Sequence, residues 1–244
     1  MGLEYARQLA AQGCALVIVS NRQDQLDEAK ASLEAGGAPS VITRYEDLAA
    51  PGAADSLHSW CKESGLEPDI LVCNAGMFFF KELESSDEPR VEAMLRLHIE
   101  TNAKLCLLFG GDMKLRRRGN IILMSSMASR LPVPGITLYS ATKAFLLSFG
   151  KSLWFEMKPY GVGVTTVCPA AIATPLYNLK PSLMKLGVRT GIIHTPEWLV
   201  RKALRASKHG RRVIRPSVMN FYLPGMIALM PAPLESLAWK KLKK

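Results

Sequence analysis

Residues 120–129 read NIILMSSMAS, an apolar run that gives way to small polar residues at Ser125 and Ser126. A run that is short and apolar at every position predicts a strand buried on both faces. Residues 15–20 (ALVIVS) and Val162–Val167 (VGVTTV) repeat this pattern. Strands of this kind belong to a parallel sheet that helices cover on both sides.

Shorter apolar runs and helical segments alternate along the rest of the chain. They predict strands at Val41–Tyr45, 69–73 and 212–214 and helices at 22–34 and 53–64. Right-handed crossovers between parallel strands give an α/β fold with a doubly wound, three-layer sheet. Such sheets bind ligands beyond the carboxyl ends of their strands, where Asn74, Ser126 and Pro169 fall.

Length and charge predict one domain with a distinct end. The 244 residues are 48% hydrophobic, which suits a single domain over residues 1–216 and an apolar, basic extension over residues 217–244. Residues 201–244 hold eleven basic residues and one acid, and account for the whole net charge of +10. Because the excess is local and has no aromatic residues interleaved on a predicted sheet face, a nucleic-acid partner is not expected.

Cysteine usage indicates a reducing compartment. The five cysteines are widely spaced and form no CxxC pair or Cys/His cluster, so neither a metal site nor a disulfide framework is predicted. The first residues lack the basic and apolar segments of a signal peptide. The chain is therefore expected in the cytoplasm.

Three residues carry a chemical pattern. Tyr139 lies thirteen residues after Ser126, and Lys143 lies four residues further on. An i, i+4 pair shares one helix face, and an ammonium beside a phenol favours the phenolate. Such a tyrosine can pass a proton to a carbonyl oxygen that a serine hydroxyl polarises. Each residue alone has an ordinary explanation, as a turn serine, an interfacial tyrosine or a solvated lysine; the ordered combination points to catalysis.

Four motifs together resemble the short-chain dehydrogenase/reductase family along nearly the whole chain. They are CNAG at 73–76, the serine strand already quoted, YSATK at 139–143 and VCPAAIAT at 167–174. The resemblance implies a Rossmann-like fold, a nicotinamide-dependent oxidoreductase, catalysis by Ser126, Tyr139 and Lys143, and a homodimer or homotetramer. It also implies cofactor contacts from Asn74, Ala75, Gly76, Tyr139, Lys143, Pro169, Ala170, Ile172 and Thr174.

The chain departs from the family pattern at three places. Ala170 replaces a usual glycine, and His98 stands where many members carry an asparagine that supports a proton relay. His98 is expected either to keep that relay in altered form or to be a buried histidine without a catalytic role. The start, MGLEYA, resembles the end of a glycine-rich phosphate loop, with Gly2 at the cofactor. The family's first strand is absent, so the strands on either side of its central place are expected to expose unpaired edges, and the protein is expected to start upstream.

The adenosine end of the site favours NADP(H). A strand that ends in Ser20-Asn21-Arg22 offers a cation and no acid to a ribose 2′-phosphate, whereas NAD sites place an acid there. A solvated Arg22 at the start of its helix is the alternative, and NAD(H) remains possible. Asp47 resembles the family's adenine-contacting acid.

Position along the chain gives the candidate substrate residues, most of which are large and apolar. They are Met127, Leu131, Phe78, Leu176 and Tyr177. With no arginine for a substrate carboxylate among them, an apolar substrate is favoured. YSATKAF at 139–145 and the long segment after Thr174 most resemble the branch that contains 3-oxoacyl-CoA reductases and 17β-hydroxysteroid dehydrogenases, which implies a lipid-like ketone such as a 3-oxoacyl chain. The alternatives are an NAD-dependent dehydrogenase of a small polar alcohol and a non-catalytic binding protein that lost its phosphate loop.

The C-terminal extension permits two interpretations. An apolar stretch at 221–230, too short to span a bilayer, precedes the basic end WKKLKK at 239–244. Such a segment suits a peripheral contact with an anionic membrane surface. A terminal helix that packs on the body or on another subunit explains it equally well.

Overall fold

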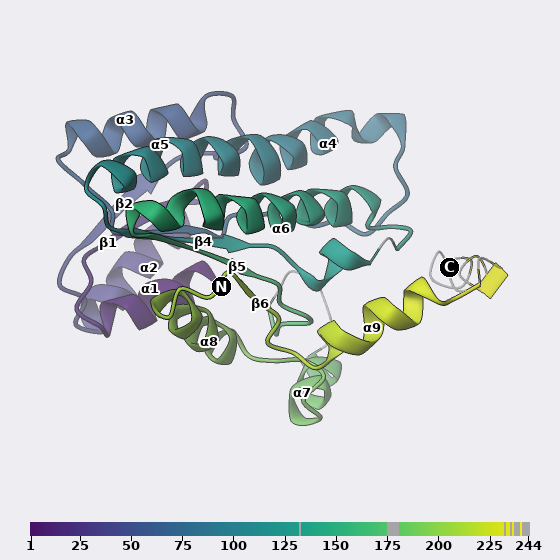
Figure 1. The fold of residues 1–244 in the computed structure, drawn as a ribbon. Helices are drawn as coiled ribbons and strands as arrows, with labels where there is room; N and C mark the ends of the chain where they lie inside the picture. The colour runs from purple at the N-terminus through teal and green to yellow at the C-terminus, as the bar shows by residue number, and fades with distance from the viewer. Residues whose placement is uncertain (132, 175–180, 232, 235, 237–239, 241–244) are drawn as a thin grey trace.

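The structure is a computed structural model that describes residues 1–131, 133–174, 181–231, 233–234, 236 and 240. Strands and helices alternate along the chain (Figure 1). The strands are β1 (Leu16–Ser20), β2 (Val41–Tyr45), β3 (Ile70–Cys73), β4 (Gly119–Met124), β5 (Val162–Val167) and β6 (Val213–Ile214). The α-helices are α1 (Gly2–Ala10), α2 (Gln23–Ala35), α3 (Ala53–Glu63), α4 (Glu88–Leu95), α5 (Asn102–Leu115), α6 (Thr137–Met157), α7 (Pro181–Arg189), α8 (Pro196–Lys208) and α9 (Met219–Ala228).

All strand pairs are parallel. One sheet has the order β3-β4-β5-β6, and β1 pairs with β2 in a second, two-stranded sheet. The longest ladder joins β4 to β5, from Gly119 opposite Val162 to Met124 opposite Val167. The predicted strands all form, within a residue or two of their expected ends, and the expectation of an α/β parallel fold is confirmed.

The two sheets are separate because β1 and β3 do not pair. Their apolar residues instead meet across α1: Leu16 and Ile18 of β1 and Ile70 and Val72 of β3 pack around Leu9. Within the described ranges no strand lies between β1 and β3. Each of these two strands therefore has one unpaired edge, as expected from the sequence.

Helices cover both faces of the sheets. In Figure 1, α3, α5 and α6 lie on one face, and α1, α2 and α8 lie on the other. The first layer packs Cys106, Leu146 and Met157 against Ile121 and Val164. The second layer is anchored by α8, whose first turn is capped by the Thr195 hydroxyl accepting a hydrogen bond from the Trp198 amide. These layers hold the carboxyl ends of β3, β4 and β5 along one rim.

The last described helix lies apart from these layers. In Figure 1, α9 runs outward from the body beyond β6 and α7. Among the described residues, no helix combines the length and apolar character needed to cross a bilayer. The proposed boundary between residues 216 and 217 stays a prediction.

Candidate active site

Tyr139 and Lys143 lie one turn apart on α6, and both are buried. The Lys143 Nζ donates a hydrogen bond to the Met124 carbonyl at the end of β4 (2.9 Å) and lies 5.5 Å from the centroid of the Tyr139 ring. Burial lowers the pKa of Lys143 to about 8. The side chain is thus still largely an ammonium at neutral pH, and it can supply the positive charge expected beside the phenol.

Ser126 follows β4 and begins a short 3-10 turn, η3 (Met127–Arg130). Its Oγ accepts a hydrogen bond from the Ala128 amide (3.1 Å). A hydroxyl that accepts in this way can still donate its hydrogen. The next amide, of Met127, donates to the Pro169 carbonyl (2.7 Å), which joins the ends of β4 and β5. The serine is therefore held at the rim, as expected for a residue after a buried strand.

Supporting residues that the sequence analysis missed hold this arrangement. The Ser125 hydroxyl donates to the Lys143 carbonyl (2.7 Å), and so ties the catalytic helix to β4. The Tyr5 hydroxyl from α1 donates to the Met124 sulfur (3.2 Å). Ser125 sits beside Ser126 in the quoted run and could have been singled out. No pattern in the sequence links Tyr5 to residue 124, because 119 positions separate them.

The turn after β3 approaches both α1 and α6. A Cβ on Gly2 would lie 3.1 Å from Asn74 Nδ2, so the start of α1 lies directly against the Asn74 side chain. A Cβ on Gly76 would lie 3.1 Å from His98 Nε2 and 3.7 Å from Lys143 Nζ. Five of the predicted cofactor and catalytic positions thus meet at this turn, and Ala75 is exposed beside them.

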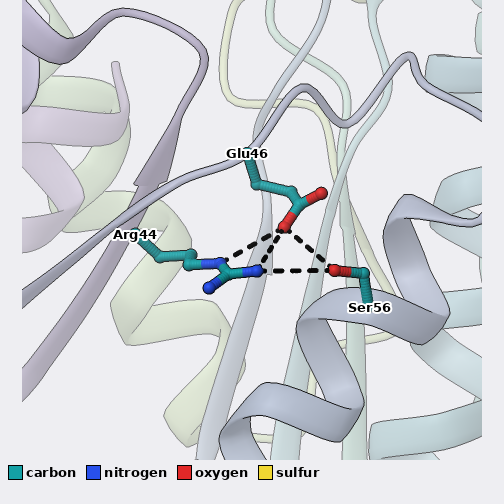
Figure 2. Close-up of polar contacts among 3 residues, drawn as sticks. All are labelled: Arg44, Glu46 and Ser56. Atoms are coloured by element: carbon teal, nitrogen blue, oxygen red, sulfur yellow. Dashed lines mark hydrogen bonds and ion pairs between the residues drawn. The ribbon is translucent and has the colours of Figure 1, made fainter.

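Asn21 and Asp47 come together at the other end of the rim. Asn21 Nδ2 donates to Asp47 Oδ1 (3.4 Å), which also accepts the Ala49 amide (3.0 Å). The neighbouring residues fix this loop: Figure 2 shows the Glu46 carboxylate between the Arg44 guanidinium (3.0 Å) and the Ser56 hydroxyl of α3 (3.1 Å).

Arg22 differs from its expectation in one respect. Its guanidinium pairs with Asp24 through two hydrogen bonds, of 2.8 and 3.2 Å. Both side chains are more than half exposed. The cation is therefore present at the end of β1, but it is shared with an acid two residues later.

The segment after β5 is held from its other side. The Ala173 amide donates to the His194 carbonyl (2.9 Å), and the His194 amide donates to the Ala171 carbonyl (3.0 Å). Ala170 and Ile172 are buried, Ile172 within the core beneath α8, whereas Pro169 and Thr174 are partly exposed. Ala170 does not have a positive φ, so the backbone at this position tolerates a Cβ.

The predicted substrate residues divide into three groups. The Phe78 ring packs edge-on against Tyr139, with centroids 5.0 Å apart, and Met127 is partly buried beside Ser126. Leu131 is buried and lines an open crevice with Ser140 of α6. Leu176 and Tyr177 lie outside the described residues.

The residues present fit a nicotinamide nucleotide at both ends of the rim. Asn21 and Asp47 meet where adenosine would bind, and Tyr139 and Lys143 lie where a nicotinamide ribose would bind. Gly2 lies so close to Asn74 that a Cβ there would be 3.1 Å from the Asn74 Nδ2. In the described part of the chain, no group of three or more His, Cys, Asp or Glu residues could hold a metal ion, and all five cysteines are free thiols.

A parallel α/β fold with a serine at the end of a strand and a tyrosine and a lysine on the helix bonded to that strand defines a Rossmann-like dehydrogenase class. Residues 1–182 match the family model for short chain dehydrogenases. The chain belongs to the short-chain dehydrogenase/reductase family, whose members are NAD(P)-dependent oxidoreductases, and this expectation is confirmed.

Curated relatives match the branch expected from the motifs. The chain is 32% identical over 220 residues to the zebrafish (Danio rerio) 17-beta-hydroxysteroid dehydrogenase type 3, covering 86% of this chain and 67% of that protein. It is 31% identical over 211 residues to the human very-long-chain 3-oxoacyl-CoA reductase, covering 84% of this chain and 64% of that protein. The chain thus spans about two thirds of the length of these relatives.

Solved structures agree on the fold. A short-chain dehydrogenase from Sphingobium yanoikuyae, in complex with NADPH, superposes with a TM-score of 0.77 at 23% identity, over 95% of this chain and 93% of that chain. A 7beta-hydroxysteroid dehydrogenase structure gives 0.84 at 22% identity, over 98% and 92%.

Proposed function

We propose that this protein is an NADP(H)-dependent oxidoreductase that transfers hydride between nicotinamide and the carbonyl carbon of a lipid-like ketone. The observation that carries the proposal is the buried Tyr139–Lys143 pair of α6, held against the end of β4 beside Ser126. Buried ionisable groups at the rim of an α/β sheet are the arrangement expected of a catalytic site.

The residues have distinct roles in the proposed reaction. When bound, the nicotinamide supplies or accepts the hydride at the substrate carbon. In the reducing direction the Tyr139 hydroxyl donates its proton to the carbonyl oxygen, so that the alcohol forms as the phenolate is left. The Ser126 hydroxyl donates a hydrogen bond to the same oxygen. The Lys143 ammonium stabilises the phenolate by its charge, and this electrostatic interaction is strong because the site is buried.

Arg22 supports the preference for NADP(H). Its guanidinium can pair with a 2′-phosphate in the bidentate geometry that it now gives Asp24. Because both side chains are exposed, their ion pair contributes little free energy, and a phosphate can replace Asp24 as the partner of Arg22. Among the similar solved structures, one dehydrogenase is in complex with NADPH and another is in complex with NADP.

The lipid-like substrate is supported by the apolar surroundings of Tyr139. Phe78 packs on its ring, and Met77, Phe79, Ile136 and Leu138 extend the apolar cluster. An apolar wall favours a substrate whose chain can be removed from water. The names of the curated relatives, a steroid dehydrogenase and 3-oxoacyl-CoA reductases, agree with this class.

The test has two stages. Fluorescence titration measures NADPH and NADH binding by this chain and by a version extended at its start with the family's first strand. Oxidation of NADPH is then followed with 3-oxoacyl-CoA, a steroid ketone and a small polar ketone. Tyr139→Phe should retain NADPH binding and lose about 100- to 10,000-fold in kcat, the range for removal of a general acid. If neither version binds a nicotinamide nucleotide, the oxidoreductase proposal fails and a non-catalytic role takes its place.

The outward face of α9 supports a peripheral contact with an anionic membrane. Val218, Phe221, Tyr222, Met226 and Leu229 point outward and are 64 to 85% exposed. Residues 216–234 contain no charged residue, whereas Arg211, Arg212 and Arg215 precede them and the basic end follows. An apolar helix between cations suits an in-plane position at an anionic lipid surface better than contact with a second, equally basic copy.

Vesicle sedimentation tests this contact. The protein should bind vesicles that contain phosphatidylserine, bind neutral phosphatidylcholine vesicles more weakly, and lose binding in Phe221→Ser/Leu229→Ser. Tyr45→Ser/Leu83→Ser, at two exposed apolar side chains outside α9, is the matched control and should bind normally. Equal binding by both double variants would refute the role of α9.

We further propose a cytoplasmic homodimer or homotetramer. Leu107 and Leu115 on α5 and Phe155 on α6 are between 60 and 86% exposed, and contact of these two helices with a second copy would remove the three side chains from water. Sedimentation equilibrium should give at least twice the 26.8 kDa mass of one chain.

A further inference from the structure

His98 is completely buried at the point where the helix α4–α5 is interrupted. Residues Arg96–Thr101 form a π-helical turn (η2), a feature that often marks functional positions in helices. The turn aims the imidazole between the loop after β3 and the catalytic helix. Its ring centroid lies 5.9 Å from that of Tyr139.

Both ring nitrogens of His98 have partners. The Met77 amide donates to Nε2 (3.0 Å), and Nδ1 lies 2.9 Å from the Thr142 Oγ1. The Thr142 hydroxyl in turn donates to the Tyr139 carbonyl (2.9 Å). One chain of hydrogen bonds therefore runs from the loop after β3, through His98, to the backbone of the catalytic tyrosine.

The directions of these bonds fix the tautomer. An amide N–H can only donate, so Nε2 must be unprotonated and accept from Met77. In a neutral imidazole the hydrogen is then on Nδ1, which donates to Thr142 Oγ1. The threonine can accept this bond because its own hydrogen is given to Tyr139. A protonated imidazole would lose the Met77 bond and leave that amide facing a like-signed N–H.

The surroundings disfavour a charge on this ring. Burial, together with the positive charge of Lys143 from α6, lowers the pKa of His98 to about 3. Gly76 packs so closely on the ring that a Cβ there would be 3.1 Å from Nε2. The imidazole is thus enclosed between the 75–77 turn and α6, with its hydrogen-bonding capacity already used.

We propose that His98 is a positioning residue that latches the 75–77 turn onto the catalytic helix as a fixed, neutral Nδ1–H tautomer, and that it does not relay protons. The latch sets the distance between the turn, which carries the proposed cofactor contacts, and Tyr139. The histidine therefore keeps the site assembled by geometry where many family members carry asparagine. Its catalytic consequence rests on the proposed function, whereas the tautomer and the latch do not.

Nuclear magnetic resonance of the ¹⁵N-labelled protein tests the tautomer directly. The His98 signals, assigned by their loss in His98→Asn, should show an Nδ1–H imidazole that does not titrate between about pH 5 and 9. An Nε2–H tautomer, or a titration near the ordinary histidine value of about 6.5, would overturn the proposal.

Two substitutions at one position test the latch. Thr142→Val removes the hydroxyl and leaves Nδ1–H without its acceptor, whereas Thr142→Ser keeps the hydroxyl and loses only a methyl group. Hydrogen exchange of the Met77 amide should become about tenfold faster in Thr142→Val and stay near the wild-type rate in Thr142→Ser. NADPH dissociation constants should follow the same order. Equal exchange in both variants would overturn the latch, while failure of the wild-type protein to bind NADPH would defeat the proposed function and leave these two results to stand.

Discussion

Two pairs of strands have equally apolar sequences but are buried to different extents: β4 and β5, here called the dense half, and β1 and β3, here called the open half. Every residue of β4 and β5 except Asn120 and Gly163 is buried. In β1 only Leu16 is buried, and in β3 only Cys73 is. The difference shows that a strand's own composition does not bury it; neighbours on both edges do, and β1 and β3 each have one.

The chemistry follows the same division. Lys143 is attached to the end of β4 by the Met124 carbonyl and the Ser125 hydroxyl, and Ser126 directly follows that strand. Asn21, Arg22 and Gly2 lie over the open half, at the ends of β1 and at the start of α1. The dense half therefore holds groups whose positions must be exact for proton transfer, and the open half holds groups that would contact the nucleotide.

The largest expected effect is on the free energy of unfolding, and it should differ between a truncation in the dense half and one in the open half. Ile122→Ala in β4 leaves a cavity in a fully buried position and should lower the free energy of unfolding by about 3 to 5 kcal/mol. Ile70→Ala in β3 affects the same residue type where it is only partly buried and should cost about 1 to 2 kcal/mol. Urea unfolding measures the free energy of both variants, and equal losses would show that β3 is packed as tightly as β4.

A helix glycine probes the packing of the dense half. A Cβ at Gly150 of α6 would overlap Thr166 Oγ1 of β5 and lie 2.8 Å from Leu123 Cδ1 of β4, so Gly150→Ala should destabilise the protein by about 1 to 3 kcal/mol. Gly111→Ala on α5 meets nothing within 4 Å and should stabilise by about 0.5 to 1 kcal/mol. Thermal unfolding of the pair decides; a stable Gly150→Ala would mean that α6 can move away from the sheet.

The pH dependence of activity should come from the dense half. Because burial lowers the pKa of Lys143 to about 8, the ammonium is lost as the pH rises above that value. The kcat/KM for reduction should therefore fall about tenfold per pH unit above pH 8 and remain level below it. A kcat/KM that decreases as the pH is lowered below about 6.5 would instead implicate a histidine.

The smallest effect is expected at the exposed edge of the open half. Arg22→Ala should raise the dissociation constant of NADPH by about three- to tenfold and leave that of NADH unchanged, because only the 2′-phosphate uses the guanidinium. Asp24→Asn is the paired control, and should tighten NADPH binding by releasing Arg22 from its ion pair. Equal changes for both nucleotides would remove the basis for the NADP(H) preference.

Local sequence patterns predicted most of the fold. The strands at Val41–Tyr45 and Val162–Val167 form over the expected residues, because short apolar runs between turn residues have few alternative structures. The π-helical turn at Arg96–Thr101 was not predicted, since it arises from packing of the helix against its neighbours rather than from a residue pattern.

The sequence by itself determined the parallel α/β fold, the family, and the order of serine, tyrosine and lysine, because the alternation of short apolar runs with helical segments and the i, i+4 spacing are local properties of the chain. Only the tertiary structure decided that Arg22 is paired with Asp24, that Tyr5 supports Met124, and that His98 joins Met77 to Thr142. The last two contacts join residues 21 to 119 positions apart. Such contacts depend on how the layers pack, and a buried ring's tautomer depends on donors and acceptors that folding alone brings together.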